Sequence, residues 1–182
     1  KAQGKWVLSL DADEALSPGL IEEIKQIIFS AAVSSEAYAI KRVSFFSGKK
    51  IRYGDWSADK VVRLFRRLAT IRFTPSMVHE HLIGYQRLAT LKQVIFHNTM
   101  KDMSQVLMKL ESYSSYGAQL AYQQHKKSSL LKAIGHSFWC FIRGYLLRLG
   151  FLDGREGFIL AISNALGVFY RYVKLIYLYE LG

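Results

Sequence analysis

Two carboxylates follow a short apolar run near the start of the chain, in the tetrapeptide Asp11-Ala12-Asp13-Glu14. Side chains alternate along an extended strand, so we expect Asp11 and Asp13 to project in the same direction. Paired carboxylate oxygens are hard ligands that suit Mg²⁺ or Mn²⁺. In open α/β sheets, ligands bind beyond the carboxyl ends of strands, and a divalent ion there can neutralise a diphosphate leaving group. The alternative is an acidic loop that caps the following helix.

A second group that could do chemistry is Val78-His79-Glu80-His81. Glu80 could act as a general base, oriented by the neighbouring His79. The pattern is not H-E-x-x-H, so a zinc-protease helix is not indicated. His97, at the end of a predicted strand, is a candidate third metal ligand beside the two aspartates. The alternatives are an ordinary surface carboxylate flanked by two histidines, and a buried, hydrogen-bonded histidine at position 97.

A basic stretch at 61–67 and a loop tryptophan complete the candidate residues. Arginine suits bidentate phosphate contacts, which makes Arg63 a candidate for binding a phosphorylated substrate. The alternative, a solvated strand edge guarded by charge, applies above all to Arg66 and Arg67. Trp56 could stack on a sugar ring, or it could simply cover the core. Arg63 and Trp56 are therefore predicted substrate-binding residues, and the family resemblance given below adds Asp11 and His79 to them.

The elements that must position these residues form a mixed pattern. Apolar runs rich in β-branched and aromatic residues predict strands at 5–10, 38–43, 61–65 and 91–96. Ser17 can cap a helix whose first position suits Pro18. Residues 47–50 predict a turn, in the manner of a hairpin. A strand, a helix and then several strands predict a mixed α/β sheet.

From Asp102 onward the pattern is helical. Asp102 is a plausible N-cap, and residues 126–129 form a polar break. Two apolar stretches with scattered basic residues follow, at 138–148 and 158–181, with a turn region at 150–157 between them. A membrane span needs about 20 predominantly apolar residues, and neither stretch is expected to be long and clean enough. The open alternatives are packed core helices and helices that lie in a membrane interface.

Composition excludes some classes of protein and favours others. The chain has 182 residues, 51% of them apolar, which excludes a disordered chain. Lys and Arg exceed Asp and Glu by 11, and this surplus favours a polyanionic partner. A single cysteine, Cys140, excludes a disulfide framework. The chain opens at Lys1 in an apolar run, so we expect a piece of a longer protein whose N-terminal part is missing, with no signal peptide.

Read in order, the motifs resemble the later part of a family 2 glycosyltransferase, and most closely the bacterial lipopolysaccharide-core β-1,4-glucosyltransferases. The resemblance covers most of the chain. The matching segments are W-V-L-S-L-D-A-D-E-x-L-S-P at 6–18, F-F-x-G-K-K-I-R-Y-G-x-W at 45–56, V-R-L-F-R-R at 62–67, V-H-E at 78–80, I-F-H-N-T at 95–99 and F-L-D-G-R-E-G-F at 151–158.

This resemblance implies a GT-A fold, a nucleotide-sugar donor and a divalent metal. Asp13 matches the more direct metal ligand and Asp11 the aspartate nearer the donor ribose. Glu80 matches the position expected for the catalytic base, and His97 a late histidine that completes the metal site in some members. The fold class expected is α/β, with a partial GT-A mixed sheet at 1–101 as the metal and acceptor half and a helical, membrane-interfacial region at 102–182. The strand and turns that would bind uracil and ribose precede this chain in the family.

The resemblance further implies an inverting, metal-dependent transfer of a hexose, glucose being the one expected, from a UDP-sugar to a lipopolysaccharide inner-core sugar. The protein would then act at the cytoplasmic face of the bacterial inner membrane, peripherally on an anionic surface. A transferase for capsule or a polyprenyl-linked sugar, and a non-catalytic membrane-associated module, are the alternatives. Basic residues are spread along the chain without a nucleic-acid-binding motif, so a nucleic-acid partner is not expected.

Overall fold

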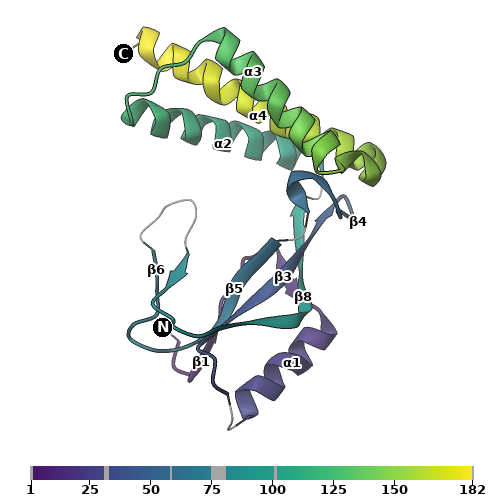
Figure 1. Ribbon diagram of the computed structural model, residues 1–182, viewed down its shortest axis with the longest axis vertical. Coiled ribbons are helices and arrows are strands. Elements are labelled where there is room, and N and C mark those ends of the chain that lie inside the picture. The colour runs from purple at the N-terminus through teal and green to yellow at the C-terminus, as the bar shows by residue number, and fades with distance from the viewer. Residues whose placement is uncertain (1, 31–32, 58, 75–80, 101, 182) are drawn as a thin grey trace. The chain divides into compact units, whose positions relative to one another are not determined.

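The computed structural model describes residues 2–30, 33–57, 59–74, 81–100 and 102–181. The chain forms two compact units, each made of two segments (Figure 1). The sheet unit comprises Lys1–Ser44 and Ala58–Asn98, and the helical unit comprises Phe45–Ser57 and Thr99–Gly182. The mixed α/β class predicted from the sequence is confirmed. The segment Phe45–Ser57 belongs with the C-terminal helices, although the sequence places it in the first half of the chain.

A mixed sheet forms the centre of the sheet unit. Its principal strands are β1 (Trp6–Leu8), β2 (Glu14–Leu16), β3 (Ala37–Phe46), β5 (Asp59–Arg66) and β8 (Leu88–Met100), in the order β1-β5-β3-β8-β2. The pairs β1–β5, β3–β5 and β2–β8 are antiparallel. β3 and β8 run in the same direction, because Glu36 N–H donates to the Arg87 carbonyl at one end and Ser47 N–H to the Met100 carbonyl at the other.

Each predicted strand is found with different bounds: the first is shorter than the range 5–10, and the other three are longer than predicted. β8 does not end at His97 but continues to Met100, because Asn98 N–H donates to the Asp13 carbonyl and the Met100 carbonyl accepts the Ser47 N–H. The alternative of a guarded strand edge is wrong for Arg66, because β5 lies between β1 and β3. Arg66 instead donates to the Val33 carbonyl at 2.7 Å and stacks its guanidinium over the Trp6 ring.

Helix α1 (Pro18–Phe29) begins where the sequence predicts. The Ser17 hydroxyl accepts the Leu20 N–H at 3.3 Å, and Pro18 occupies the first turn, where its missing N–H is not needed. The buried face of α1 carries Leu20 and Ile24. These two side chains pack with the inward residues of β3, β5 and β8 in one hydrophobic cluster, whose members are Leu20, Ile24, Tyr38, Ile40, Leu64, Leu91 and Ile95.

A second, smaller cluster in the sheet unit is formed by Ala37, Phe65, Ile71 and Leu82. Ala37 and Phe65 alternate along their strands with Tyr38 and Leu64 of the first cluster, so they face the other side of the sheet. Leu82 comes from the short pair β6 (Arg72–Phe73) and β7 (Leu82–Ile83). Both faces of the central strands are therefore partly covered.

The predicted turn after β3 is confirmed. Ser47 and Gly48 both have positive φ, at 48° and 78°, and join β3 to β4 (Lys49–Lys50) with Phe46 paired to Lys49. Positive φ at both central residues is the geometry of a type I′ hairpin turn, whose twist matches the flanking strands. After the turn, the one-turn helix η1 (Gly54–Trp56) ends at Trp56, the tryptophan predicted to stack on a sugar.

The helical unit is built around its last helix. α2 (Met103–Gln123) is capped by Asp102, which accepts the Gln105 N–H at 3.0 Å as predicted. α3 (Leu130–Phe141) continues into the π-helical turn η2 (Ile142–Leu147). The one-turn helix η3 (Gly150–Asp153) then leads into α4 (Gly154–Leu181), which packs along both α2 and α3 (Figure 1).

Two expectations about the C-terminal half are corrected. The turn region expected at 150–157 is helical from Gly150 onward, since η3 passes directly into α4. The second apolar stretch was expected to be too short for a span, but Gly150–Leu181 is long and apolar enough to cross a membrane by length and composition. Ser163 does not interrupt the helix, because its hydroxyl donates to the Ile159 carbonyl at 2.7 Å. Core helices of soluble proteins meet the same criterion.

Candidate functional site

The acidic tetrapeptide forms a turn between β1 and β2. Glu14 N–H donates to the Asp11 carbonyl at 3.0 Å, and Asp11 N–H donates to Glu14 Oε2 at 3.1 Å. Asp11 and Asp13 were expected to project in the same direction along a continuing strand. The turn overturns this expectation, because the extended geometry ends before Asp11 and each aspartate meets a different partner.

Asp13 lies beside His97, as the predicted metal site requires. Asp13 Oδ2 and His97 Nε2 are 3.2 Å apart. Backbone pairing fixes this approach, since Asn98 N–H donates to the Asp13 carbonyl at 2.9 Å and Glu14 stands opposite His97 in the β2–β8 register. The Asp13 side chain is 39% exposed, whereas His97 is largely buried. The pair therefore offers a carboxylate and an imidazole at the surface of the sheet unit.

Arg63 holds the other acidic residues of the turn. Its Nη2 donates to Glu14 Oε1 at 2.7 Å and also to Asp11 Oδ2. Arg63 lies on β5, next to the chain that leads into the turn, where Ser9 N–H donates to the Arg63 carbonyl at 2.8 Å. The predicted phosphate-binding arginine is thus engaged by carboxylates of the candidate site. Its role towards a phosphate stays a prediction.

Glu14 is a further residue of the site, and the sequence pattern indicated no role for it. Its side chain is 0% exposed and lies between two arginines, Arg63 and Arg42, with Arg42 Nη1 at 3.4 Å. Arg42 in turn donates to both carboxylate oxygens of Asp59, at 3.0 and 2.8 Å. Burial lowers the pKa of Arg42, but the hydrogen bonds and charges of Asp59 and Glu14 outweigh it and raise that pKa overall.

A signal for Glu14 was present in the sequence. A buried acid needs a paired cation, and β3 and β5 carry Arg42 and Arg63 next to apolar residues of the same strand. An acid that follows D-A-D at the start of a strand is the natural partner of such arginines. The pairing itself joins residues 28 and 49 positions apart, which spacing alone does not reveal.

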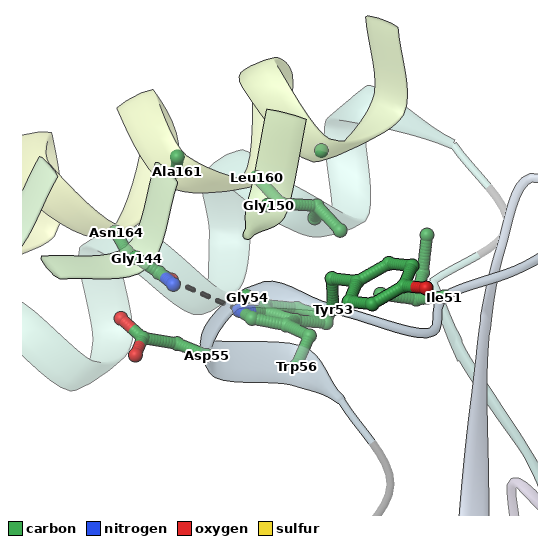
Figure 2. A pocket seen from close by; sticks show the side chains of 11 residues that line it. Ile51, Tyr53, Gly54, Asp55, Trp56, Gly144, Gly150, Leu160, Ala161 and Asn164 are labelled. Carbon is green, nitrogen blue, oxygen red and sulfur yellow. Dashed lines mark hydrogen bonds between the residues drawn. The ribbon is translucent and has the colours of Figure 1, made fainter. Parts of the chain in front are cut away.

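Trp56 lies in the helical unit. Its indole N–H donates to Asn164 Oδ1 of α4 at 3.0 Å (Figure 2). The ring also packs against the cluster that contains Phe46, Ile51 and Leu160. The predicted stacking of Trp56 on a sugar stays a prediction.

Asp55, the neighbour of Trp56, anchors the same segment to η2. Asp55 accepts hydrogen bonds from Arg143 at 3.0 Å and from Arg148 at 2.6 Å. The hydrogen bond to Asp55 raises the pKa of Arg143. Further along, the Asp153 carboxylate accepts the backbone N–H groups of Arg52 and Tyr53. Two of the sequence motifs, at 45–56 and 151–158, thus bind each other.

The contact between η1 and the start of α4 is called the seam below, and a small pocket lies along it (Figure 2). Glycines let the backbone approach closely there. A Cβ on Gly157 would stand 1.9 Å from the Gly150 carbonyl oxygen, and one on Gly150 would stand 2.6 Å from that of Gly144. The seam is therefore a tightly packed joint between helical segments.

Glu80 and His79 lie outside the described residues. His81 is described, and its N–H donates to Thr74 Oγ1 at 3.0 Å while its carbonyl accepts the Thr74 N–H at 2.9 Å, beside the β6–β7 pair. The assignment of Glu80 as catalytic base and of His79 as a substrate contact stays a prediction.

The residues present fit a divalent ion in part. Within the described ranges, no three His, Cys, Asp or Glu side chains are grouped as a metal site. Asp13 and His97, at 3.2 Å, are close enough to share one ion, and their oxygen and nitrogen donors suit Mn²⁺. Asp11 is held by Arg63 and stands outside this pair. An ion on Asp13 would keep positions open for oxygens of a phosphorylated ligand.

The chain is similar in sequence to curated proteins of Rickettsia that carry the name uncharacterized glycosyltransferase. It is 29% identical to one from R. prowazekii (strain Madrid E) and 28% identical to one from R. typhi (strain ATCC VR-144 / Wilmington), each over 179 residues that cover 93% of this chain. A relative from R. conorii (strain ATCC VR-613 / Malish 7) is also 28% identical. The chain spans 61% of the length of the first two relatives and 64% of the third.

Neither a family model nor a solved structure matches the chain significantly. Sequence similarity over nearly the whole chain therefore links it to proteins that are named glycosyltransferases, and the finer assignments rest on its own residues.

Proposed function

We propose that the protein is a glycosyltransferase of the inverting, metal-dependent, family 2 type. Similarity to named glycosyltransferases over 93% of the chain supports the coarse assignment. The observation that carries the finer one is the pairing of Asp13 with His97 at the end of the acidic turn. In this proposal the donor is a UDP-hexose, with glucose the expected sugar, and the acceptor is an inner-core sugar of lipopolysaccharide.

Asp13 and His97 would hold the divalent ion, which supplies positive charge beside the diphosphate leaving group. Asp13 presents its exposed carboxylate, and His97 is fixed by its place within β8. Asp11 would lie nearer the ribose. The ion pair of Arg63 with the buried Glu14 keeps the turn in place, so Glu14 is a positioning residue in this scheme.

Glu80 is the proposed general base. It would accept the proton of the acceptor hydroxyl as that oxygen bonds to the anomeric carbon and the bond from this carbon to the diphosphate breaks, which inverts the configuration. His79 and Arg63 are the proposed contacts for substrate. The charge of +11 suits a donor and an acceptor that both carry phosphate.

The test is a transfer reaction with the intact protein. UDP-glucose, Mn²⁺ and a lipopolysaccharide inner-core oligosaccharide are incubated, and mass spectrometry and NMR identify any added hexose and its anomeric configuration. We expect one β-linked hexose, and no product when the metal is chelated. Transfer to a polyprenyl phosphate but not to the core sugar would replace the acceptor in the proposal. The absence of transfer from any UDP-hexose to either acceptor, by folded protein, would reject the activity.

A further inference from the structure

The side of α3 that faces away from the rest of the helical unit is apolar. Ala133 and Cys140 are buried against the unit. At 100° per residue, the opposite side of the helix is formed by Leu131, Ile134 and Phe138. Leu131 is 83% exposed and Phe138 is 66% exposed. A helix of a free-standing soluble domain would carry polar residues on this side, so the pattern indicates an apolar partner.

α4 repeats this arrangement. Its buried side includes Leu160 and Ala161, next to the seam with η1. Phe158, Ile162, Leu166, Tyr170 and Tyr177 follow one another at helical spacing on the opposite side, and all are exposed. Only 22% of the most apolar window of this helix is buried in the protein, and the side chains of this row are among those left exposed.

Aromatic contacts connect the end of α3 to the start of α4 beside these exposed sides. Tyr145 of η2 stacks on Phe141 of α3 at 5.2 Å between ring centroids, and both rings contact Phe158 of α4, at 5.6 and 6.0 Å. Phe151 packs against Tyr145 at 6.2 Å. We call the outward residues of α3 and α4, together with this aromatic cluster, the α3–α4 face.

Charge indicates which partner the α3–α4 face would bind. The helical unit carries 13 Lys and Arg residues against six Asp and Glu residues, a net charge of +7. Lys132 flanks the exposed side of α3, and Arg155 stands one turn before Phe158 on the same side of α4, largely exposed. An anionic surface complements this charge. A second copy of the same unit would be repelled by it.

We propose that the α3–α4 face binds flat in the interface of an anionic lipid bilayer. Aromatic and aliphatic side chains would enter the boundary between headgroups and acyl chains, and Lys132 and Arg155 would contact lipid phosphates. A flat orientation follows from the other side of α4, where Asn164 binds Trp56, and from Asp55, which pairs with Arg143 of η2 and with Arg148, the residue after it. Exposure of these polar groups to hydrocarbon would be unfavourable. The inference rests on the helical unit alone and does not depend on the proposed activity.

The test is flotation of the intact protein with vesicles of equimolar phosphatidylglycerol and phosphatidylcholine at low ionic strength. The double variant Leu131→Glu/Phe138→Glu should lose binding by at least tenfold. The control Phe29→Glu/Leu68→Glu makes the same change of charge at exposed apolar residues of the sheet unit, of which Phe29 is 84% exposed, and should still float. Circular dichroism checks that both variants are folded.

Further variants and conditions separate the contribution of charge to vesicle binding from that of apolar contact. Lys132→Gln and Arg155→Gln should each weaken binding by about fivefold, and rising salt should weaken binding of the wild type. Bound protein should be released by alkaline carbonate.

Three results would overturn the proposal. The first is that the wild type does not float at low salt. The second is that the control variant loses as much binding as Leu131→Glu/Phe138→Glu. The third is that the protein stays on the vesicles after carbonate, which would indicate a membrane span. Concentration-dependent dimers that Leu131→Glu/Phe138→Glu abolishes, without vesicle binding, would assign the face to a second copy. Transfer to a water-soluble acceptor should be unchanged in these variants, so failure of this proposal is distinct from failure of the proposed activity.

Discussion

The buried carboxylate of Glu14 accepts a 2.7 Å hydrogen bond from Nη2 of Arg63, and the same nitrogen also binds Asp11. This contact ties the acidic turn to β5, in the interior of the sheet. It explains why an acid follows directly after the two aspartates. The turn that presents Asp13 is thereby held by an ion pair that solvent does not reach on the Glu14 side.

Glu14→Gln should destabilise the sheet unit. The variant keeps the shape of the side chain but leaves Arg63 and Arg42 facing a neutral amide. We expect a loss of about 3 kcal/mol in the free energy of unfolding, the lower end for a broken buried ion pair, because both arginines keep a second carboxylate. Urea denaturation measures it. Glu22→Gln, which removes an exposed pair with Lys25, is the control and should change stability by less than about 1 kcal/mol. Equal effects in the two variants would contradict the structural role of Glu14.

Gly157→Ala should destabilise the helical unit, because the new methyl group would collide with the Gly150 carbonyl. Forced repacking of this kind costs about 1–3 kcal/mol. Gly135→Ala is the matched control, since a Cβ there meets nothing within 4 Å and alanine favours a helix by about 0.5–1 kcal/mol. Thermal denaturation should therefore show a lower melting temperature for Gly157→Ala and a higher one for Gly135→Ala. An unchanged melting temperature in Gly157→Ala would contradict the close backbone approach at Gly157.

The ion pair between Glu156 and Lys49 predicts a pH dependence of stability. The hydrogen bond from Lys49, together with hydrogen bonds from the backbone and from Arg155, lowers the pKa of Glu156 from 4.5 to about 2. A carboxylate with a lowered pKa in the folded state stabilises the fold above its unfolded pKa, and this contribution is lost as pH falls from about 4.5 towards about 2. The difference in melting temperature between the wild type and Glu156→Gln should therefore be largest at neutral pH and vanish in that acid range. A difference that does not change with pH would show that Glu156 acts by packing.

Glu80→Gln tests the proposed base. The amide keeps the shape of the side chain but cannot accept a proton, so turnover at saturating substrate should fall by about 10²–10⁴-fold. Binding of the donor should change little, because the general base acts on the acceptor. Near-normal turnover in the variant would remove Glu80 from this role and turn attention to His79.

Local signals predicted most of the individual elements. The caps at Ser17 and Asp102 and the turn at 47–50 lie where the sequence indicated. Each depends on residues within a few positions, so the sequence pattern contains the information that decides it.

Contacts between distant residues account for what the sequence did not predict. The turn at Asp11 is stabilised by Arg63 and Glu14, and the assumption of a continuing strand ignored both. The segment Phe45–Ser57 joins the helical unit because Asp55 and Asp153 bind partners about 90 to 100 positions away. The place of His97 at the end of a strand made it a candidate metal ligand, but the β2–β8 register that sets it beside Asp13 joins residues 84 positions apart, which no local pattern reveals.

The most direct test of the proposed donor site is isothermal titration calorimetry of UDP binding to the intact protein, with and without Mn²⁺. We expect the wild type and the control Glu22→Gln to bind UDP only when Mn²⁺ is present. Asp13→Asn should keep the fold but lose this metal-dependent binding, since an amide is a much weaker ligand than a carboxylate. Equal UDP binding by the wild type and Asp13→Asn in the presence of Mn²⁺ would contradict the assignment of Asp13 as a metal ligand.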